Sequence, residues 1–267
     1  MFGAVIGDIV GSRFEFNNIK TKDFELFSPQ SAFTDDSVLT IALAKAILAT
    51  GGDHETLSDM AISSMRTFGR KYDTKSWGKM FAKWLYSANP EPYYSYGNGA
   101  AMRVSPAAMA ARTLEEAMFL SRELTRVTHN HPEGIKGAEA TTVAIYMAKS
   151  GDSMEDIGEV LGGKYYDLNF TLDEIRDSYR FDGTCQGTVP QALKAFLEST
   201  SFEDALRNAV SIGGDSDTIA AIACSVAGVY YGVPKELAEK ASTYLPKPLQ
   251  KAIDDFEKAF PLHNLSS

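Results

Sequence analysis

The chain has 267 residues, of which 44% are hydrophobic and 23% are charged, a length and balance that predict a globular protein with a substantial core. The 26 basic and 35 acidic residues leave a net charge of -9, which argues against non-specific binding of nucleic acid. No apolar stretch reaches the ~18 residues of a membrane span, and the N-terminus lacks the basic segment of a secretory signal. The two cysteines form no disulfide framework. We therefore expect a cytoplasmic protein that binds neither nucleic acid nor membrane.

Helical periodicity recurs along almost the whole chain, and no series of alternating strands stands out. The least regular stretch is 163–187, where short extended or loop structure is expected. There is no repeat, low-complexity tract or linker, so the sequence predicts one all-α domain over 1–267, built from many short helices. The expected helices cover 2–12, 36–49, 55–70, 76–87, 98–112, 114–128, 133–149, 153–161, 188–199, 202–210, 216–231, 234–242 and 247–259.

The first expected helix carries Gly3, Gly7 and Gly11 at a spacing of four residues. Glycine costs about 1 kcal/mol per helical position relative to alanine. Three glycines on one face therefore indicate close packing against another helix. Glu15 follows this helix, and it is either an ordinary surface carboxylate or an extra carboxylate for a metal site.

Two aspartate clusters open the expected helices 36–49 and 216–231. Each places two carboxylates and a threonine hydroxyl within a few residues, and hard divalent cations prefer several charged oxygen ligands of this kind. Helix capping is the alternative, with Thr34 or Asp35 capping one helix and Asp215 the other, and both roles can hold together. If the clusters meet, they form a metal centre that can be binuclear, which would indicate a hydrolase. Their sequences are Phe33-Thr34-Asp35-Asp36-Ser37 and Gly213-Gly214-Asp215-Ser216-Asp217-Thr218.

A glycine-rich segment, Ser95-Tyr96-Gly97-Asn98-Gly99, leads into the expected helix 98–112. Such a turn exposes backbone N–H groups to an anion, with the helix dipole behind them. It matches neither a Walker A loop nor a dinucleotide-binding loop, and an ordinary Asn-Gly turn is the alternative.

Two histidines lie in the segment Thr128-His129-Asn130-His131-Pro132. Hydrogen bonding is the preferred role for His129, because aspartates are available as metal ligands; helix termination before Pro132 is the alternative. No serine lies in a nucleophile elbow, which makes covalent acyl chemistry unexpected. The segment 185–190 is interpreted mainly as a loop and helix start without chemistry.

Five of these segments, in this order, resemble the motifs of the ADP-ribosylglycohydrolases. They read GDIVGSRFE at 7–15, FTDDS at 33–37, SYGNGAAMR at 95–103, THNHPEG at 128–134 and GGDSDTIAAI at 213–222. The resemblance implies a compact, orthogonal multi-helix bundle with two divalent cations, Mg²⁺ or Mn²⁺. It implies Thr34, Asp35, Asp36, Asp215, Asp217 and Thr218 as metal ligands, with Glu15 and Asp36 as candidate catalytic carboxylates. It also implies that Ser95, Tyr96, Gly97, Asn98 and Gly99 bind the diphosphate and ribose of ADP-ribose, and that His129 faces the same cleft.

The implied activity is metal-dependent removal of ADP-ribose from an arginine or serine side chain, or from a small acceptor, by an activated water at the anomeric carbon. The substrate would be an ADP-ribosylated protein or small molecule, and the product ADP-ribose. The form of segment 95–103 is closer to members that act on serine-linked or O-acyl ADP-ribose. Two alternatives stay open: a non-catalytic ADP-ribose-binding protein, because the family includes a lens crystallin, and a metal-dependent hydrolase of another nucleotide or N-glycoside.

Overall fold

The computed structural model describes residues 1–73 and 76–262; the stretches 74–75 and 263–267, which the predicted single domain also includes, lie outside them. Within the described ranges every regular element is helical, apart from one isolated antiparallel bridge between Gly97 and Thr184, so the predicted all-α class is confirmed. Single 3-10 turns cover Ser12–Phe14, His54–Thr56 and Asn98–Ala100. The α-helices are α1 Phe2–Gly11, α2 Asp35–Thr50, α3 Leu57–Lys71, α4 Lys79–Tyr86, α5 Ser105–Ala110, α6 Leu114–Arg126, α7 Pro132–Ser150, α8 Met154–Lys164, α9 Leu172–Arg176, α10 Cys185–Leu197, α11 Phe202–Ser211, α12 Ser216–Tyr230, α13 Lys235–Ser242 and α14 Lys247–Ala259.

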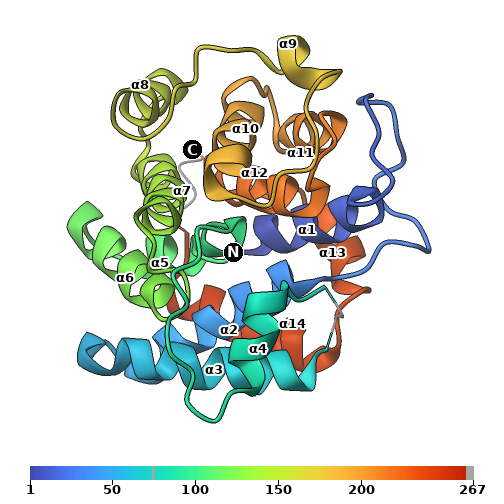
Figure 1. Ribbon diagram of the computed structural model, residues 1–267. Helices are drawn as coiled ribbons and strands as arrows, with labels where there is room; N and C mark the ends of the chain where they lie inside the picture. Colours follow the sequence, from blue (N-terminus) through green and yellow to red (C-terminus); the bar gives the residue numbers. More distant parts are fainter. Residues whose placement is uncertain (74–75, 263–267) are drawn as a thin grey trace.

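Helices α1 and α12 lie side by side in the middle of the molecule, with α10 and α11 above them and α2 below in the view of Figure 1. The glycines of α1 explain the close approach. A Cβ atom on Gly7 would lie 2.2 Å from the carbonyl oxygen of Ala220, and one on Gly11 would lie 2.5 Å from the Cα atom of Asp217. The predicted close helix packing is confirmed. Since it fixes the C-terminal end of α1 against the start of α12, it sets the position of Asp217.

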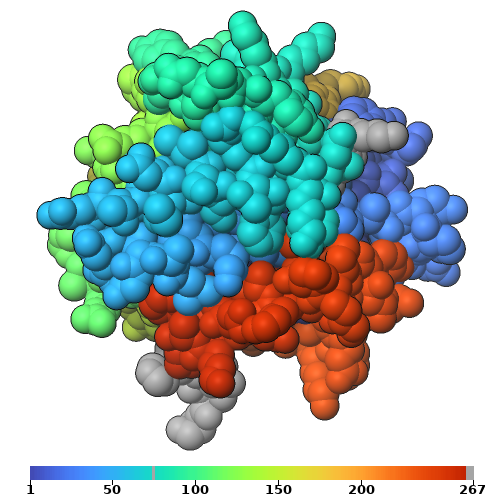
Figure 2. Space-filling model, turned by 90° about the horizontal axis from the view of Figure 1, so that it is seen from below, coloured from blue at the N-terminus to red at the C-terminus, as the bar shows by residue number. Residues whose placement is uncertain are grey.

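One continuous hydrophobic core joins the helices, and Cys224 of α12 is buried in it. Helix α12 is buried from Ser216 to Gly228, and α2 is buried along most of its length. Helix α14 covers α2 from outside, and Figure 2 shows this C-terminal segment against the surface formed by the α2–α4 region. No helix in the described ranges is both long and apolar enough to cross a bilayer.

The expected helix 98–112 is interrupted. The structure has a single 3-10 turn at 98–100, further turns over 101–103, and a separate short helix, α5. Pro106 lies in the first turn of α5, where its missing N–H costs little, so it suits a new helix start better than the middle of a longer helix. The interruption turns Met102 and Arg103 into the interior.

The stretch 163–187 is more helical than expected. Thr171 and Glu174 form a capping box that starts α9. Helix α10 begins at Cys185, three residues before the expected start, because the Thr184 side chain accepts a hydrogen bond from the N–H of Gly187. The segment 185–190, expected mainly as a loop and helix start, is therefore helical throughout, and Pro190 lies inside the helix.

Candidate functional site

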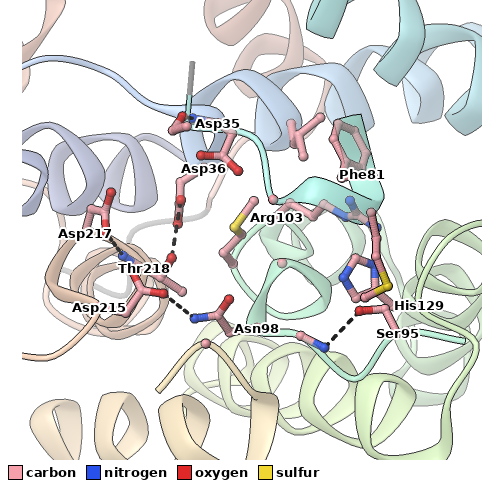
Figure 3. Close-up of a pocket in the computed structure, with 18 of the residues that line it drawn as sticks. Asp35, Asp36, Phe81, Ser95, Asn98, Arg103, His129, Asp215, Asp217 and Thr218 are labelled. Atoms are coloured by element: carbon pink, nitrogen blue, oxygen red, sulfur yellow. Dashed lines mark hydrogen bonds between the residues drawn. The ribbon is translucent and has the colours of Figure 1, made fainter. Parts of the chain in front are cut away.

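The two aspartate clusters meet in one pocket of about 440 Å³, formed by the starts of α2 and α12 and by segment 95–103 (Figure 3). The Thr218 hydroxyl donates a hydrogen bond of 3.4 Å to Asp36 Oδ2, although the two residues are 182 positions apart. Carboxylate oxygens of Asp8, Asp36 and Asp217 lie within 4.8 Å of one another, and so do those of Glu15, Asp215 and Asp217. The fold thus gathers carboxylates from three segments at one place.

At the start of α2, capping and site geometry occur together. Thr34 is the N-cap, and its hydroxyl accepts from the N–H of Asp36 at 3.3 Å. The same hydroxyl donates to Asp8 Oδ1 at 2.6 Å. Asp8 Oδ2 accepts from the N–H groups of Thr34 at 2.9 Å and Ser37 at 3.1 Å. This buried aspartate of α1 therefore holds the start of α2, a role that the sequence analysis missed. The available signal was a carboxylate inside an otherwise apolar helix.

At the start of α12, the aspartate does not cap. Gly213 and Gly214 have φ angles of 68° and 76°, a left-handed turn that glycine adopts without strain. Asp215 occupies the N-cap position, but its side chain makes no capping hydrogen bond. Instead Asp215 Oδ2 accepts from Asn98 Nδ2 at 2.7 Å. The Asn98 amide, predicted to bind ADP-ribose, is thus turned toward this carboxylate.

Glu15 lies half-buried at the rim of the pocket. Asn18 joins its segment to the double-glycine turn: its side-chain amide donates to the carbonyl oxygens of Glu15 at 3.0 Å and Gly214 at 2.9 Å and accepts from the N–H of Gly214 at 2.8 Å. Asn18 belongs to no motif, so no sequence signal pointed to this bridge.

The carboxylates are held where ionisation is unfavourable. Burial raises the pKa of Asp8 to about 6, and burial together with neighbouring carboxylates raises the pKa of Asp35 and of Glu15 to about 7. The same two causes hold the pKa of Asp36 and of Asp217 well above the usual range. Within the described ranges the buried Asp36 Oδ1 has no hydrogen-bond partner. Converging oxygens, one of them unpartnered, fit the ligand set of hard divalent cations.

The second end of the pocket is formed by segment 95–99 and His129. Ser95 Oγ accepts from the N–H of Gly97 at 3.1 Å, and the N–H of Asn98 donates to the carbonyl of Gly183 at 2.8 Å. Only one 3-10 turn follows, so the helix dipole expected behind this segment is absent from the described structure, a correction that follows from the interrupted helix 98–112. Tyr96 is 46% exposed, does not line the pocket, and packs its ring against His131.

His129 is buried, and its Nδ1 lies 2.8 Å from the hydroxyl of Thr128. Arg103, which the sequence analysis did not single out, is completely buried beside it and donates to the same hydroxyl at 2.6 Å. His131 has a different role, because its Nδ1 accepts from the N–H of Glu133 and caps α7. Of the two histidines, only His129 faces the pocket.

Comparisons with known proteins agree with this architecture. The sequence profile of the family described as ADP-ribosylglycohydrolase matches residues 1–264. ADP-ribosylarginine hydrolase Tri1 of Pseudomonas putida is 26% identical, over 95% of this chain and 76% of that protein. ADP-ribosylhydrolase ARH3 of Homo sapiens is 24% identical, over 96% and 88% respectively. The ADP-ribosyl-[dinitrogen reductase] glycohydrolase of Rhodospirillum rubrum is 26% identical, over 94% and 92%.

A solved structure titled "ADP-ribosylglycohydrolase-related protein complex" has the same fold, with a TM-score of 0.64 at 23% sequence identity. The superposition covers 99% of this chain and 95% of the chain in that structure. The five sequence motifs, the pocket that they form and the profile match over almost the whole length lead to one conclusion: the chain belongs to the ADP-ribosylglycohydrolase family.

Proposed function

We propose that this protein is a hydrolase that releases ADP-ribose from a modified protein side chain or from a small ADP-ribosylated acceptor. The observation that carries the proposal is one pocket with two chemically different ends. At one end the carboxylates of Asp36, Asp215 and Asp217 converge, and at the other end Gly97 and His129 form a wall beside the buried Arg103. A volume of about 440 Å³ suits a nucleotide-sized ligand.

The carboxylate end is proposed to hold two divalent cations, Mg²⁺ or Mn²⁺. Asp35, Asp36, Asp215 and Asp217 would supply most of the ligand oxygens, with Thr34 and Thr218 contributing hydroxyls. In bound form the cations would polarise ribose oxygens and lower the pKa of a water molecule toward ~7. The unpartnered Asp36 Oδ1 and the raised pKa values of the surrounding carboxyls support this assignment.

The chain's own residues would then manage protons and orientation. Hydrolysis at the anomeric carbon moves one proton from the attacking water and delivers one to the released group. Glu15 and Asp36 are the proposed carboxyls for this work. A pKa of about 7 lets Glu15 exchange a proton near neutral pH, and its half-buried place at the rim leaves it accessible to the released group. Asp8 would act indirectly, by holding Thr34 and Ser37 in place.

At the other end, the diphosphate is proposed to bind to Ser95, Gly97, Gly99 and His129. Asn98 would hold the Asp215 carboxylate in place through its hydrogen bond, and Tyr96 lies outside the pocket wall. The acceptor can be arginine, serine or a small molecule: Tri1 is named for ADP-ribosylarginine, whereas the 95–103 segment favours the serine or O-acyl type.

The test is release of free ADP-ribose from arginine-, serine- and O-acetyl-linked substrates, with Mg²⁺ and with a chelator. Metal-dependent release from one linkage that is lost in Asp36→Asn supports the proposal. The matched control is Asp254→Asn, which removes an exposed carboxylate on α14. Calorimetric binding of ADP-ribose without release from any linkage would instead support the non-catalytic alternative.

A further inference from the structure

Arg103 is a buried cation for which the proposed reaction has no direct use. Its side chain is completely buried, and Figure 3 shows its end beside the imidazole of His129. Within residues 1–73 and 76–262 it makes no ion pair, and its Nε and Nη1 have no hydrogen-bond partner. Burying a charge in this way is unfavourable unless it serves the structure or the site. Arg103 is part of the pocket wall, but its side chain exposes no surface to solvent, and the pocket residue beside it is the neighbour His129.

That neighbour is reached through the hydroxyl of Thr128. A guanidinium can only donate hydrogen bonds, so Thr128 Oγ1 accepts from Arg103 Nη2 at 2.6 Å. The hydroxyl hydrogen is then free to donate. His129 Nδ1 lies 2.8 Å away and the carbonyl of Thr125 at 3.4 Å, and the hydroxyl of Tyr93 is a further neighbour of Thr128. Arg103 Nη2 also lies 3.4 Å from the same Nδ1. With two donors facing it, Nδ1 is an acceptor and carries no hydrogen.

A neutral imidazole with a bare Nδ1 carries its hydrogen on Nε2. Nε2 faces the glycine-rich turn: it lies 3.4 Å from the position that a Cβ on Gly99 would take, and 3.6 Å from that of Gly97. Within the described structure no residue accepts from Nε2. The charged or titratable groups that face the ring are Arg103 and Tyr93, whose ring lies edge-on at 5.6 Å. Burial and the charge of Arg103 hold the pKa of His129 well below its usual value, which keeps the ring neutral.

We propose that Arg103 and Thr128 are positioning residues that fix His129 as its Nε2–H tautomer, so that it donates a hydrogen bond to a phosphate oxygen of a bound nucleoside diphosphate. A neutral donor of fixed direction binds the diphosphate without adding a second buried cation next to Arg103. The identity of the ligand rests on the proposed function, whereas the tautomer rests only on the hydrogen bonds around Nδ1.

The tautomer can be measured directly by long-range ¹H–¹⁵N correlation spectra of protein labelled at its four histidines. A His129→Gln variant identifies the His129 signals. We expect the wild type at pH 7 to show a protonated Nε2 and a bare Nδ1. In Thr128→Val the Nδ1–H form should appear, because valine cannot donate to Nδ1, whereas Thr128→Ser keeps the hydroxyl and should keep the wild-type pattern. An Nδ1–H tautomer or a doubly protonated ring in the wild type, or an unchanged pattern in Thr128→Val, would overturn the proposal.

The matched control is Thr142→Val. Thr142 is also a completely buried threonine, but its hydroxyl donates to Ser121 at 2.9 Å and not to His129. In calorimetric titrations ADP-ribose should bind about tenfold more weakly to Thr128→Val and to Arg103→Met, and as in the wild type to Thr142→Val and Thr128→Ser. Adenosine, which has no phosphate, should bind all five proteins alike.

The two proposals fail in different ways. A wild type that shows the Nε2–H tautomer but does not bind ADP-ribose would contradict the proposed function and leave the tautomer assignment intact. A tautomer that changes in Thr128→Val without weaker binding of ADP-ribose would overturn the inferred phosphate contact of His129.

Discussion

Replacing Asp217 with asparagine should stabilise the metal-free protein, and more strongly at pH 8 than at pH 5. The folded protein holds the pKa of this carboxyl well above its usual value, through burial and through the charges of Asp215, Asp36 and Glu15. An acid whose pKa is raised by folding binds its proton more tightly in the folded state. The free energy of unfolding therefore falls as the pH rises from the unfolded pKa, near 4, through the folded one. Asparagine keeps an oxygen to accept from the N–H of Thr218, which lies 3.0 Å from Asp217 Oδ1, but never ionises.

The magnitude follows from the spacing of the carboxylates. Two unit charges 4.8 Å apart, the upper limit of the distances within the cluster, repel by about 3 kcal/mol at an effective dielectric constant of ~20. The neighbours share protons, so we expect a net gain of about 1–3 kcal/mol at pH 8, or roughly 2–4 °C in Tm per kcal/mol. At pH 5 the folded carboxyl is protonated, but the unfolded one is already largely ionised, so the gain is smaller there and disappears only below the unfolded pKa, near 4.

The assay is thermal unfolding by circular dichroism, in chelator, at both pH values. Asp254→Asn serves as the control, since it removes one exposed carboxylate that belongs neither to the pocket nor to the cluster, and it should change Tm little at either pH. Equal destabilisation of Asp217→Asn at pH 5 and pH 8 would refute the reasoning, because it would show that this carboxylate supports the helix start and is not strained by its neighbours.

Three further outcomes are expected. Gly7→Ala should lower the free energy of unfolding by more than about 2 kcal/mol, because its Cβ would lie 2.2 Å from the carbonyl oxygen of Ala220. Gly162→Ala is the control, because Gly162 has open space around it, and it should not lower this free energy. Thermal unfolding of the two variants makes the comparison. Ser95→Ala should weaken ADP-ribose binding by about 1–3 kcal/mol in calorimetry, and Gly97→Val should weaken it more. A Cβ on Gly97 would lie 3.6 Å from His129 Nε2, and the valine methyl groups would enter the pocket. Unchanged affinity in Gly97→Val would show that this turn is not part of the ligand site. Glu15→Gln should lower kcat at least about 100-fold and remove the group that titrates near pH 7 from the dependence of the rate on pH. Stabilisation of the protein by Mg²⁺ should persist. An unaltered dependence of the rate on pH would exclude Glu15 as the proton carrier.

The parts of the fold that could be predicted from sequence are those with a local cause. Three glycines at helical spacing favour close packing along one helix face, and the structure places α12 against that face. Thr34 marks the start of α2 because a threonine before two aspartates can cap a helix by itself. The aspartate clusters could be recognised for the same reason, since each gathers its oxygens within a few residues.

What the sequence could not reveal depends on contacts between distant segments. Asp8 and Arg103 both lie inside recognised motifs, but their roles become visible only when α1 meets α2 and when segment 101–103 turns inward. The break in the expected helix 98–112 has the same origin. The helical spacing of apolar residues continues through 98–112, but the chain turns inward at Met102 and Arg103, which are buried, and the helix is interrupted there. Asn98 was assigned to the ligand from its motif, while its amide is directed at Asp215, far along the chain.

The most direct test of the proposed metal centre is anomalous diffraction from crystals grown with Mn²⁺. The account predicts two anomalous peaks between the starts of α2 and α12, each about 2.0–2.6 Å from carboxylate oxygens, with Asp36 and Asp217 among the ligands. Well-ordered crystals in which Mn²⁺ binds only at surface carboxylates, and leaves this cluster without a peak, would contradict it.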